Sequence, residues 1–396
     1  MNMDIEIHTY AVDKHWDSDI SIYVMTTEIS AIILAAGYAS RMGRMKPLLP
    51  LGKESVIAHV AESFREAGVN AITIILGHQC SDIIPELEKY SLAWKVNQHY
   101  DQGMLSSIKK GIEELGSDTK AFFIMPVDIP LVRPSTLQHL VEKHKAHPGQ
   151  VIYPVFQGQR GHPPLVPACF AGEILTYEGS GGLRRCLQAW DRDSLDVAVA
   201  DQGVLVDMDT PDDYAAILER YRHLAMPSKK EALALLMIHQ HDNPSVVAHA
   251  SAVASVAAAI GQALNRSGNN VNVRLIETAG LLHDIAKGRS NHAQRGAELI
   301  AANGFKAVAD VAGQHMNLVF DPSNGINEAD VVYLADKMVS GSEIVPLERR
   351  LHWKKEQFRD DSEALKMMSF RMEQAIRIRQ TIAKMIGNPL EKLFLP

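Results

Sequence analysis

The sequence predicts a doubly wound α/β domain followed by an all-helical domain. Short apolar strands alternate with helical segments through the first half of the chain, which is typical of a largely parallel sheet with helices on both faces. Beyond Pro227-Ser228 convincing strands cease, and the chain is nearly all helical. A length of 396 residues is sufficient for two or more separate cores.

The first half alternates between strand and helix in a regular order. An apolar strand opens the stretch from Ala31 to Gly52, and a helix is expected over Glu54–Ala67, where Gly68 provides a C-terminal signal. Because ligands of doubly wound sheets bind beyond the carboxyl ends of the strands, the residues that follow each strand are the candidates for a site. Further strands are expected at Ala71–Leu76, Ala121–Met125 and Val151–Val155.

Changes in composition suggest where the domains begin and end. The first residues carry no recognisable chemistry and form either a frayed extension or an added strand at 21–25. The last part contains charged helices at 348–359 and 362–386, in which we find no chemistry. The expected division is an N-terminal extension (1–28), an α/β domain (29–225), a helical domain (228–345) and a C-terminal helical segment (346–396).

Composition and charge narrow the class of protein. A formal net charge of −7 and the lack of a basic tract argue against nucleic acid as a main partner. The 3 cysteines are scattered, which favours neither a disulfide framework nor a thiolate zinc site. Acidic residues before residue 28 exclude a secretory apolar region, and His249 and Gln262 interrupt the apolar stretch Val246–Leu264. We therefore expect a cytoplasmic protein that binds no membrane.

A glycine loop with two cations follows the first strand. Gly37 and Gly43 bound a segment that carries Arg41, and Lys46 comes shortly after it. Bare backbone N–H groups allow a phosphate to approach closely, and the cations neutralise its charge. The spacing fits neither the dinucleotide-binding loop nor the P-loop. The alternative is an ordinary strand-to-helix turn with surface cations.

Carboxylates follow two later strands. Asp128 lies in the sequence PVDIP just beyond the strand at 121–125, where a carboxylate can bind Mg²⁺ or can simply cap a turn. The sequence VDMDTPDD places Asp207 and Asp209 before a helix whose start is explained by Thr210 and Pro211. The sequence therefore predicts a polyanion site with carboxylates for a hard cation.

The string LAAGYASRMGRMKPLLPLG resembles the signature of nucleotidyltransferases that make activated sugars and pterins. It is most similar to the molybdenum cofactor cytidylyltransferase branch, which has Leu-Ala-Ala-Gly, Arg-Met-Gly and Lys-x-Leu-Leu. The resemblance implies a Rossmann-like nucleotidyltransferase domain, in which Arg41 and Lys46 contact phosphates and Asp128 holds the catalytic Mg²⁺. It also implies a second metal contact from Asp207 or Asp209, of which Asp207 is preferred.

The same resemblance implies the remaining contacts of the first domain. Ser180 stands where the pattern has an aspartate, which leaves the acceptor open. His162, in a Gly-His-Pro turn, and Arg184 are expected near the acceptor molecule. Nucleotide contacts are expected from the loop residues Leu34, Ala35, Ala36, Gly37 and Gly43, and from a second loop at Gly103, Ser106 and Ser107, where a plain helix cap is the alternative for Ser107.

Histidines and aspartates organise the helical half. Neutral imidazoles and carboxylates that converge from separate helices form metal sites. Taken singly, each of these histidines fits a helix surface better than a ligand position, but an adjacent His-Asp pair followed by Lys287 on the same helix face is uncommon by chance. The candidate metal ligands are His249, His283, Asp284, His292, His315 and Asp336.

This set resembles the HD phosphohydrolase superfamily, on the strings LLHDIAKG and HAQRGAEL and over roughly 239–340. The resemblance implies an all-α HD domain with a divalent metal of unknown identity. His249, His283, Asp284 and Asp336 would be the metal ligands. His292 and His315 would hold a second metal or phosphate, and Lys287 would contact phosphate as a catalytic residue.

The expected protein is a bifunctional enzyme. Its first domain would transfer a nucleotidyl group, with CTP as the favoured donor, to a molybdopterin-type acceptor and release pyrophosphate. A molybdoenzyme or its chaperone would be a further partner. The second domain would hydrolyse a phosphate ester or anhydride. Two alternatives remain open at this stage: a transferase for sugar phosphates, and an HD domain that senses nucleotides and regulates the first domain without hydrolysis.

Overall fold

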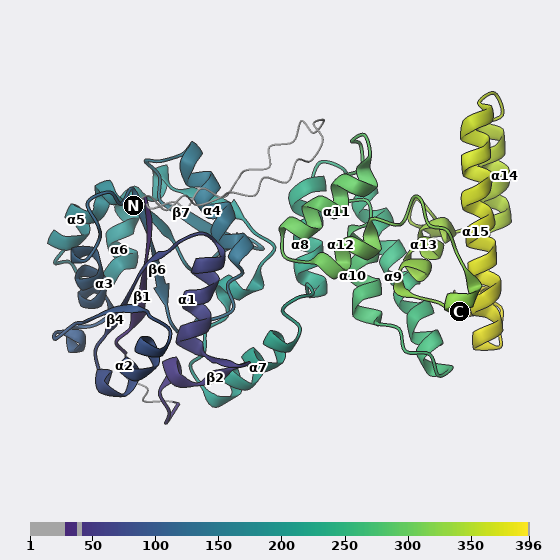
Figure 1. Cartoon of the computed structure of the whole chain (residues 1–396). Coiled ribbons are helices and arrows are strands. Elements are labelled where there is room, and N and C mark those ends of the chain that lie inside the picture. The colour runs from purple at the N-terminus through teal and green to yellow at the C-terminus, as the bar shows by residue number, and fades with distance from the viewer. Residues whose placement is uncertain (1–27, 38–41, 395–396) are drawn as a thin grey trace, which may run out of the picture.

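The computed structural model describes residues 28–37 and 42–394, so the extension 1–27 and Arg41 lie outside the described residues. An α/β domain and a helical domain follow one another along the chain, as expected (Figure 1). The main sheet of the first domain has the strand order β10-β7-β9-β6-β1-β4-β5, with β8 paired to β7. Its strands are β1 (Ile29–Ala35), β4 (Ala71–Leu76), β5 (Ala93–Val96), β6 (Ala121–Pro126), β7 (Ile152–Phe156), β8 (Gln159–Arg160), β9 (Leu165–Pro167) and β10 (Leu195–Ala198).

Helices cover both faces of this sheet, which confirms the doubly wound class. One core joins the sheet to α1, α2, α4 and α7, and the other joins its opposite face to α3, α5 and α6. Strands β1, β4, β5 and β6 are parallel, whereas β9 runs antiparallel between β6 and β7. The helices are α1 (Val56–Glu66), α2 (Cys80–Lys89), α3 (Met104–Glu113), α4 (Pro134–Ala146), α5 (Ala171–Thr176), α6 (Gly182–Leu187) and α7 (Pro211–Arg222).

Local signals place most of these elements correctly. The strand expected at Ala71–Leu76 is β4 with the same bounds. The helix expected from Glu54 begins two residues later, because the Ser55 side chain accepts from the Ala58 N–H as a cap. Glu54–Ser55 instead forms β3, which pairs with β2 (Pro50–Leu51). Ser107 is not a cap either, since α3 begins at Met104.

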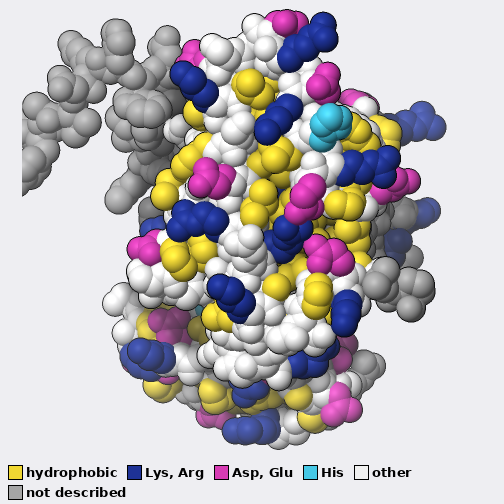
Figure 2. Space-filling view, turned by 90° about the vertical axis from the view of Figure 1, so that its right-hand side faces the viewer, with side chains coloured by type: hydrophobic (Ala, Val, Ile, Leu, Met, Phe, Trp, Pro, Cys, Tyr) yellow, Lys and Arg dark blue, Asp and Glu magenta, His cyan; other side chains and the backbone are white. Residues whose placement is uncertain are grey.

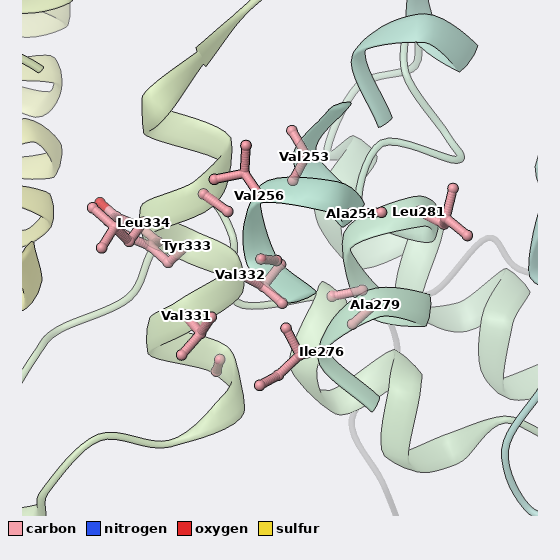
Figure 3. Close-up of a cluster of buried hydrophobic side chains, with 14 of the residues drawn as sticks. Val253, Ala254, Val256, Ile276, Ala279, Leu281, Val331, Val332, Tyr333 and Leu334 are labelled. Atoms are coloured by element: carbon pink, nitrogen blue, oxygen red, sulfur yellow. The ribbon is translucent and has the colours of Figure 1, made fainter. Parts of the chain in front are cut away.

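The helical domain is built around α9, α10 and α13 (Figure 3). Valine, alanine and leucine side chains of these three helices meet in one buried core. By length and composition α9 is apolar enough to cross a membrane, but half of that stretch is buried inside the protein, as in a core helix. The helices are α8 (Lys229–Gln240), α9 (Pro244–Arg266), α10 (Val273–Leu282), α11 (His292–Ala302), α12 (Lys306–Ala312), α13 (Glu328–Met338), α14 (Leu347–Gln357) and α15 (Ser362–Ile386).

The sequence predicts no strand in the second half, a helix cap at Asn291 and a helix over Phe305–His315, and the structure differs in all three features. A short antiparallel pair, β11 (Val339–Ser340) and β12 (Glu343–Ile344), follows α13 although no strand was expected there. Asn291 has a left-handed backbone with φ 51° and makes no side-chain cap. Helix α12 ends at Ala312, so His315 lies beyond it. Helix α15 packs into the core of the helical domain, because its buried residues Met372, Ile378 and Ile382 belong to the same hydrophobic core as those of α9 and α13.

A buried charge cluster joins the two halves. Arg133, just before α4, extends its guanidinium toward Glu231 of α8, 3.4 Å from Oε1, and over the Phe305 ring at 4.6 Å. It also donates to the Leu224 carbonyl. Asp201 accepts from the Arg133 N–H at 2.8 Å, and burial raises the pKa of Asp201. The two halves therefore share a desolvated ion cluster.

We expect Arg133→Met to destabilise the protein by about 3–5 kcal/mol, because it leaves buried carboxylates without a cation. Arg133 and Glu231 side chains are 8% and 5% exposed, so water cannot replace the lost partner. The measurement is urea unfolding followed by circular dichroism. Arg222→Met, at a side chain 69% exposed, is the control and should change stability by less than about 1 kcal/mol. Equal stability of both variants would contradict this account.

Candidate active sites in the two domains

The carboxyl ends of three parallel strands form the first site. Leu34 of β1 is in register with Pro126 of β6, and Ala35 with Leu76 of β4, so these strands end at one edge. A cavity of about 430 Å³ opens there. Among the predicted residues, its lining contains Leu34, Ala35, Ala36, Gly37, Lys46, Gly103, Ser107 and Asp128.

Lys46 brings two carboxylates together at this cavity. Its ammonium lies 3.1 Å from Asp128 Oδ2 and 2.6 Å from Asp209 Oδ1. Burial disfavours the charge of Lys46, but the hydrogen bond to Asp209 and the charge of Asp128 outweigh burial and raise its pKa. The Asp209 backbone N–H donates to Asp213 at 3.1 Å, which ties it to the cap of α7. Asp207 is the carboxylate preferred from the sequence as the second metal contact, whereas Asp209 is the one that pairs with Lys46, so the choice of metal contact stays a prediction.

Other predicted residues lie outside the cavity lining. Asp207 is exposed. Burial lowers the pKa of His162, and the charges of Asp128 and Asp207 act against that shift. Ser106 accepts from the Asn97 amide at 2.8 Å and donates to backbone carbonyls. Arg184 is exposed on α6. Gly43, φ 63°, is also absent from the lining, so all of these assignments stay predictions.

Two aromatic residues that line the cavity were not predicted from the sequence, one after β4 and one after β5. His78 and Tyr100 line the cavity, and their rings lie 6.0 Å apart. A side chain at Gly77 would meet Tyr100 at 2.6 Å and the Ala36 carbonyl at 2.8 Å, so this position needs glycine. The rule that ligands bind beyond strand ends would have indicated His78, because it lies two residues after the end of β4.

The second site contains two groups of metal-ligand type. His249, His283 and Asp336 form one group, and Asp284, His292 and His315 form the other, with the ligand atoms of each group within 4.8 Å of one another. The groups meet at His283, whose Nε2 lies 3.6 Å from Asp284 and 3.7 Å from Asp336. The structure therefore brings together all six residues that were predicted from the sequence.

Backbone carbonyls orient the imidazoles toward the centre. Nδ1 of His283 lies 2.8 Å from the Gly280 carbonyl, that of His315 2.8 Å from Ala312, and that of His249 2.9 Å from Gly341. A proton on Nδ1 leaves Nε2 as the acceptor, which is the form that binds a metal. The buried Nε2 of His283 has no hydrogen-bond partner in the described structure.

The charge states fit a divalent ion. Burial lowers the pKa of His283 to about 4, so the imidazole is neutral at pH 7. Burial alone would raise the pKa of Asp284, but the hydrogen bond to His315, together with the charge of Lys287, outweighs it and holds that pKa below its usual value. Two carboxylates and four imidazoles that are held by backbone or buried neighbours form a suitable donor set for one or two divalent metals.

Two lysines flank the ligands differently. Lys287 has a side chain 47% exposed, and its ammonium lies 3.1 Å from Asp284 Oδ2. Lys337 is buried and donates to Asp336 Oδ2 at 2.6 Å and to the His315 carbonyl at 2.7 Å. Lys287 can therefore reach an incoming phosphate, whereas Lys337 holds one oxygen of a ligand in place.

Comparison with known families agrees with both sites. Residues 31–195 match the MobA-like NTP transferase domain, and residues 246–340 match the HD domain. The chain is therefore an enzyme that joins a nucleotidyltransferase-type domain to a domain of the HD phosphohydrolase type.

Individual relatives match the first half. The molybdenum cofactor cytidylyltransferase of Escherichia coli (strain K12) is 25% identical over 197 residues, 50% of this chain and 98% of that protein. The bifunctional protein GlmU of Staphylococcus haemolyticus (strain JCSC1435) is 33% identical over 119 residues, 30% of this chain and 26% of that protein. Nicotine blue oxidoreductase of Paenarthrobacter nicotinovorans is 28% identical over 196 residues, 46% of this chain and 92% of that protein. Among solved structures, Rv0371c from Mycobacterium tuberculosis H37Rv is similar with a TM-score of 0.44 at 25% identity, covering 49% of this chain and 98% of that one.

Proposed function

We propose that the first domain transfers a cytidylyl group from CTP to a molybdopterin-type phosphate and releases pyrophosphate. The observation that carries this proposal is the arrangement of Lys46 between Asp128 and Asp209 at the mouth of a cavity formed by strand ends. The similarity to molybdenum cofactor cytidylyltransferase supports the choice of donor and acceptor. The enzyme would act in the cytoplasm, and a molybdoenzyme or its chaperone would receive the product.

Positioning and charge neutralisation suffice for this transfer. The attacking group is already an anionic phosphate oxygen, so no general base is required. Asp128, with Asp209, would hold Mg²⁺, which neutralises the triphosphate. Lys46, kept protonated by its carboxylate neighbours, would contact the transferring phosphate, and the backbone at Gly37 would approach the nucleotide closely.

We expect CTP to be used at least about tenfold better than GTP in kcat/KM. The reason is the Leu-Ala-Ala-Gly start and Met45-Lys46, which resemble the cytidylyl-transferring branch. The measurement is pyrophosphate release with a molybdopterin acceptor, supported by thermal shifts with each of the four triphosphates and Mg²⁺, because a ligand of the native state raises its stability. Equal turnover of CTP and GTP would count against this donor assignment.

For the helical domain we propose metal-dependent hydrolysis of a phosphate ester or anhydride. A divalent ion held by His249, His283, Asp336 and by the Asp284 group would supply Lewis acidity and an activated water. The neutral imidazole of His283 keeps its Nε2 available as a ligand, and Lys287 would neutralise and orient the phosphate. Metal analysis of the purified protein together with a phosphatase screen tests this proposal. A metal-loaded protein that binds nucleotides without hydrolysing any substrate would favour the regulatory alternative.

A further inference from the structure

One histidine of the metal centre is oriented by a distant part of the chain. Nδ1 of His249 lies 2.9 Å from the Gly341 carbonyl, and because a carbonyl oxygen only accepts, Nδ1 carries the proton and Nε2 is left as a ligand atom. Gly341 is 92 residues away from His249 in sequence, whereas the carbonyls that orient His283 and His315 lie only 3 residues before them. His283 and His315 are therefore oriented by their own turns, and His249 depends on whatever holds Gly341 in place.

Gly341 belongs to the turn of the β11–β12 hairpin, which is too short to be rigid alone. Its ladder consists of two residue pairs, Val339 with Ile344 and Ser340 with Glu343. An isolated two-stranded hairpin is at best marginally stable in water. Gly341 is exposed and has a left-handed backbone with φ 61°. The hairpin therefore needs contacts from outside itself to hold its turn carbonyl in one position.

Arg350 of α14 supplies such a contact. Its half-buried guanidinium donates through Nη1 to the carbonyls of Asp336 and Val339, where α13 ends and β11 begins. Carbonyls at the carboxyl end of a helix lack partners within the helix and interact favourably with a cation. A single side chain thereby fixes the point at which α13 passes into the hairpin. Helix α14 begins beyond residue 340, where the matched HD range ends, and belongs to the segment 346–396, in which the sequence indicates no chemistry.

Helix α14 is itself held in place by the rest of the helical domain. Leu347 is buried in the core, and Leu351 packs against it. Glu348 accepts from Arg379 of α15 through both carboxylate oxygens, at 2.6 and 3.2 Å. On the outer surface of these C-terminal helices acidic, basic and apolar side chains are interspersed (Figure 2), whereas Arg350 is directed inward to backbone carbonyls. Arg350 therefore extends from an anchored helix toward the metal centre.

We propose that Arg350 is a positioning residue of the metal centre, which holds the β11–β12 hairpin so that the Gly341 carbonyl keeps His249 Nε2 directed at the metal position. This inference rests on the hydrolase function proposed above. His249 Nε2 lies 3.2 Å from Asp336 Oδ1, so the ring already faces its ligand group. The Asp336 side chain depends less on Arg350, because Lys337 donates to its Oδ2 at 2.6 Å. Arg350 therefore acts mainly through His249.

Imidazole N–H protons report on this role directly. The full chain, carrying Asp128→Asn to weaken metal binding in the first domain, is loaded with Co²⁺, and proton NMR records the hyperfine-shifted N–H signals of the metal-bound imidazoles. His249→Ala identifies the His249 signal by its loss. Arg350→Met should remove or broaden the same signal through exchange with water, because Nδ1 loses a fixed acceptor. The signals of the other metal-bound imidazoles should stay, because their carbonyl partners belong to their own turns.

Metal affinity gives the magnitude of the effect. Co²⁺ is titrated calorimetrically into the metal-stripped proteins, and Arg350→Met should weaken the His249-dependent binding by about tenfold, as expected for a group that orients a metal ligand. Arg350→Lys keeps a cation that can donate to both carbonyls, so it should regain most of this affinity. Arg349→Met, at an exposed neighbouring position, is the matched control and should change neither the affinity nor the spectrum. Circular dichroism and thermal unfolding verify that the variants are folded.

An unchanged His249 signal in folded Arg350→Met would overturn the proposal. An equal loss of all imidazole signals would overturn it as well, because that result indicates general destabilisation. Hydrolysis of pyrophosphate and p-nitrophenyl phosphate is measured on the same preparations. An Arg350-dependent His249 signal in a protein that hydrolyses neither compound would reject the hydrolase function and retain the positioning role, so the two claims fail separately.

Discussion

Asp128→Asn is expected to reduce nucleotidyl transfer by about 10²-fold or more while the fold stays intact. The amide has nearly the volume of the carboxylate, but it carries no charge to hold Mg²⁺ or to pair with Lys46, 3.1 Å away. The measurement is pyrophosphate release at saturating CTP and Mg²⁺. Circular dichroism and thermal unfolding show whether the variant is folded.

Asp212→Asn is the matched control for this variant. Asp212 is an exposed carboxylate in the first turn of α7, three residues after Asp209, so the change removes a charge near the site without removing a proposed ligand. It should alter the rate by less than about threefold. Full activity of folded Asp128→Asn would reject the metal-ligand assignment.

Asp284→Ala is expected to remove most of the divalent metal from the helical domain and to abolish its hydrolytic activity. Asp284 Oδ1 lies 3.4 Å from His292 and 3.5 Å from His315, so the change takes the carboxylate from one ligand group and a neighbour from the other. Thermal stability should fall as well, because a metal bound only by the native state contributes to folding free energy. Metal content, hydrolysis and unfolding are measured on one preparation.

Nucleotidyl transfer should persist in Asp284→Ala, because Lys46, Asp128 and Asp209 belong to a different core. Asp310→Ala, which removes an exposed carboxylate on α12, is the control and should retain metal and both activities. If transfer is lost together with hydrolysis while the first domain remains folded, the halves are functionally coupled, and the regulatory alternative gains support.

The fold class follows from local patterns that the sequence contains. Apolar runs such as Ala71–Leu76 are strands with the expected bounds, and the carboxylate of Asp128 lies where a strand-end rule places it. The histidines of the helical half converge as predicted. This convergence was predictable because the adjacent pair His283-Asp284 is a strong local signal. These features depend on short segments, and short segments carry much of their own conformational preference.

The remaining features depend on packing between distant segments. Tyr100 lines the first cavity from a single turn of 3₁₀ helix, which has no periodic pattern in the sequence. The ion pair between Lys46 and Asp209 depends on the cap of α7, in which the Asp209 backbone N–H donates to Asp213. Arg350 of α14 donates to the carbonyls of Asp336 and Val339, a contact between distant segments that a charged helix alone does not indicate.

The charge cluster between the halves restricts how this two-domain chain can change. Arg133 lies five residues after Asp128, so the segment 128–133 carries a proposed metal ligand at one end and a residue of the charge cluster at the other. A chain that lost its helical half would remove Glu231 and Phe305 from Arg133, and a substitution at any one of these positions would require compensation at another. We therefore expect homologues that contain both domains to vary Arg133, Asp201 and Glu231 as a set.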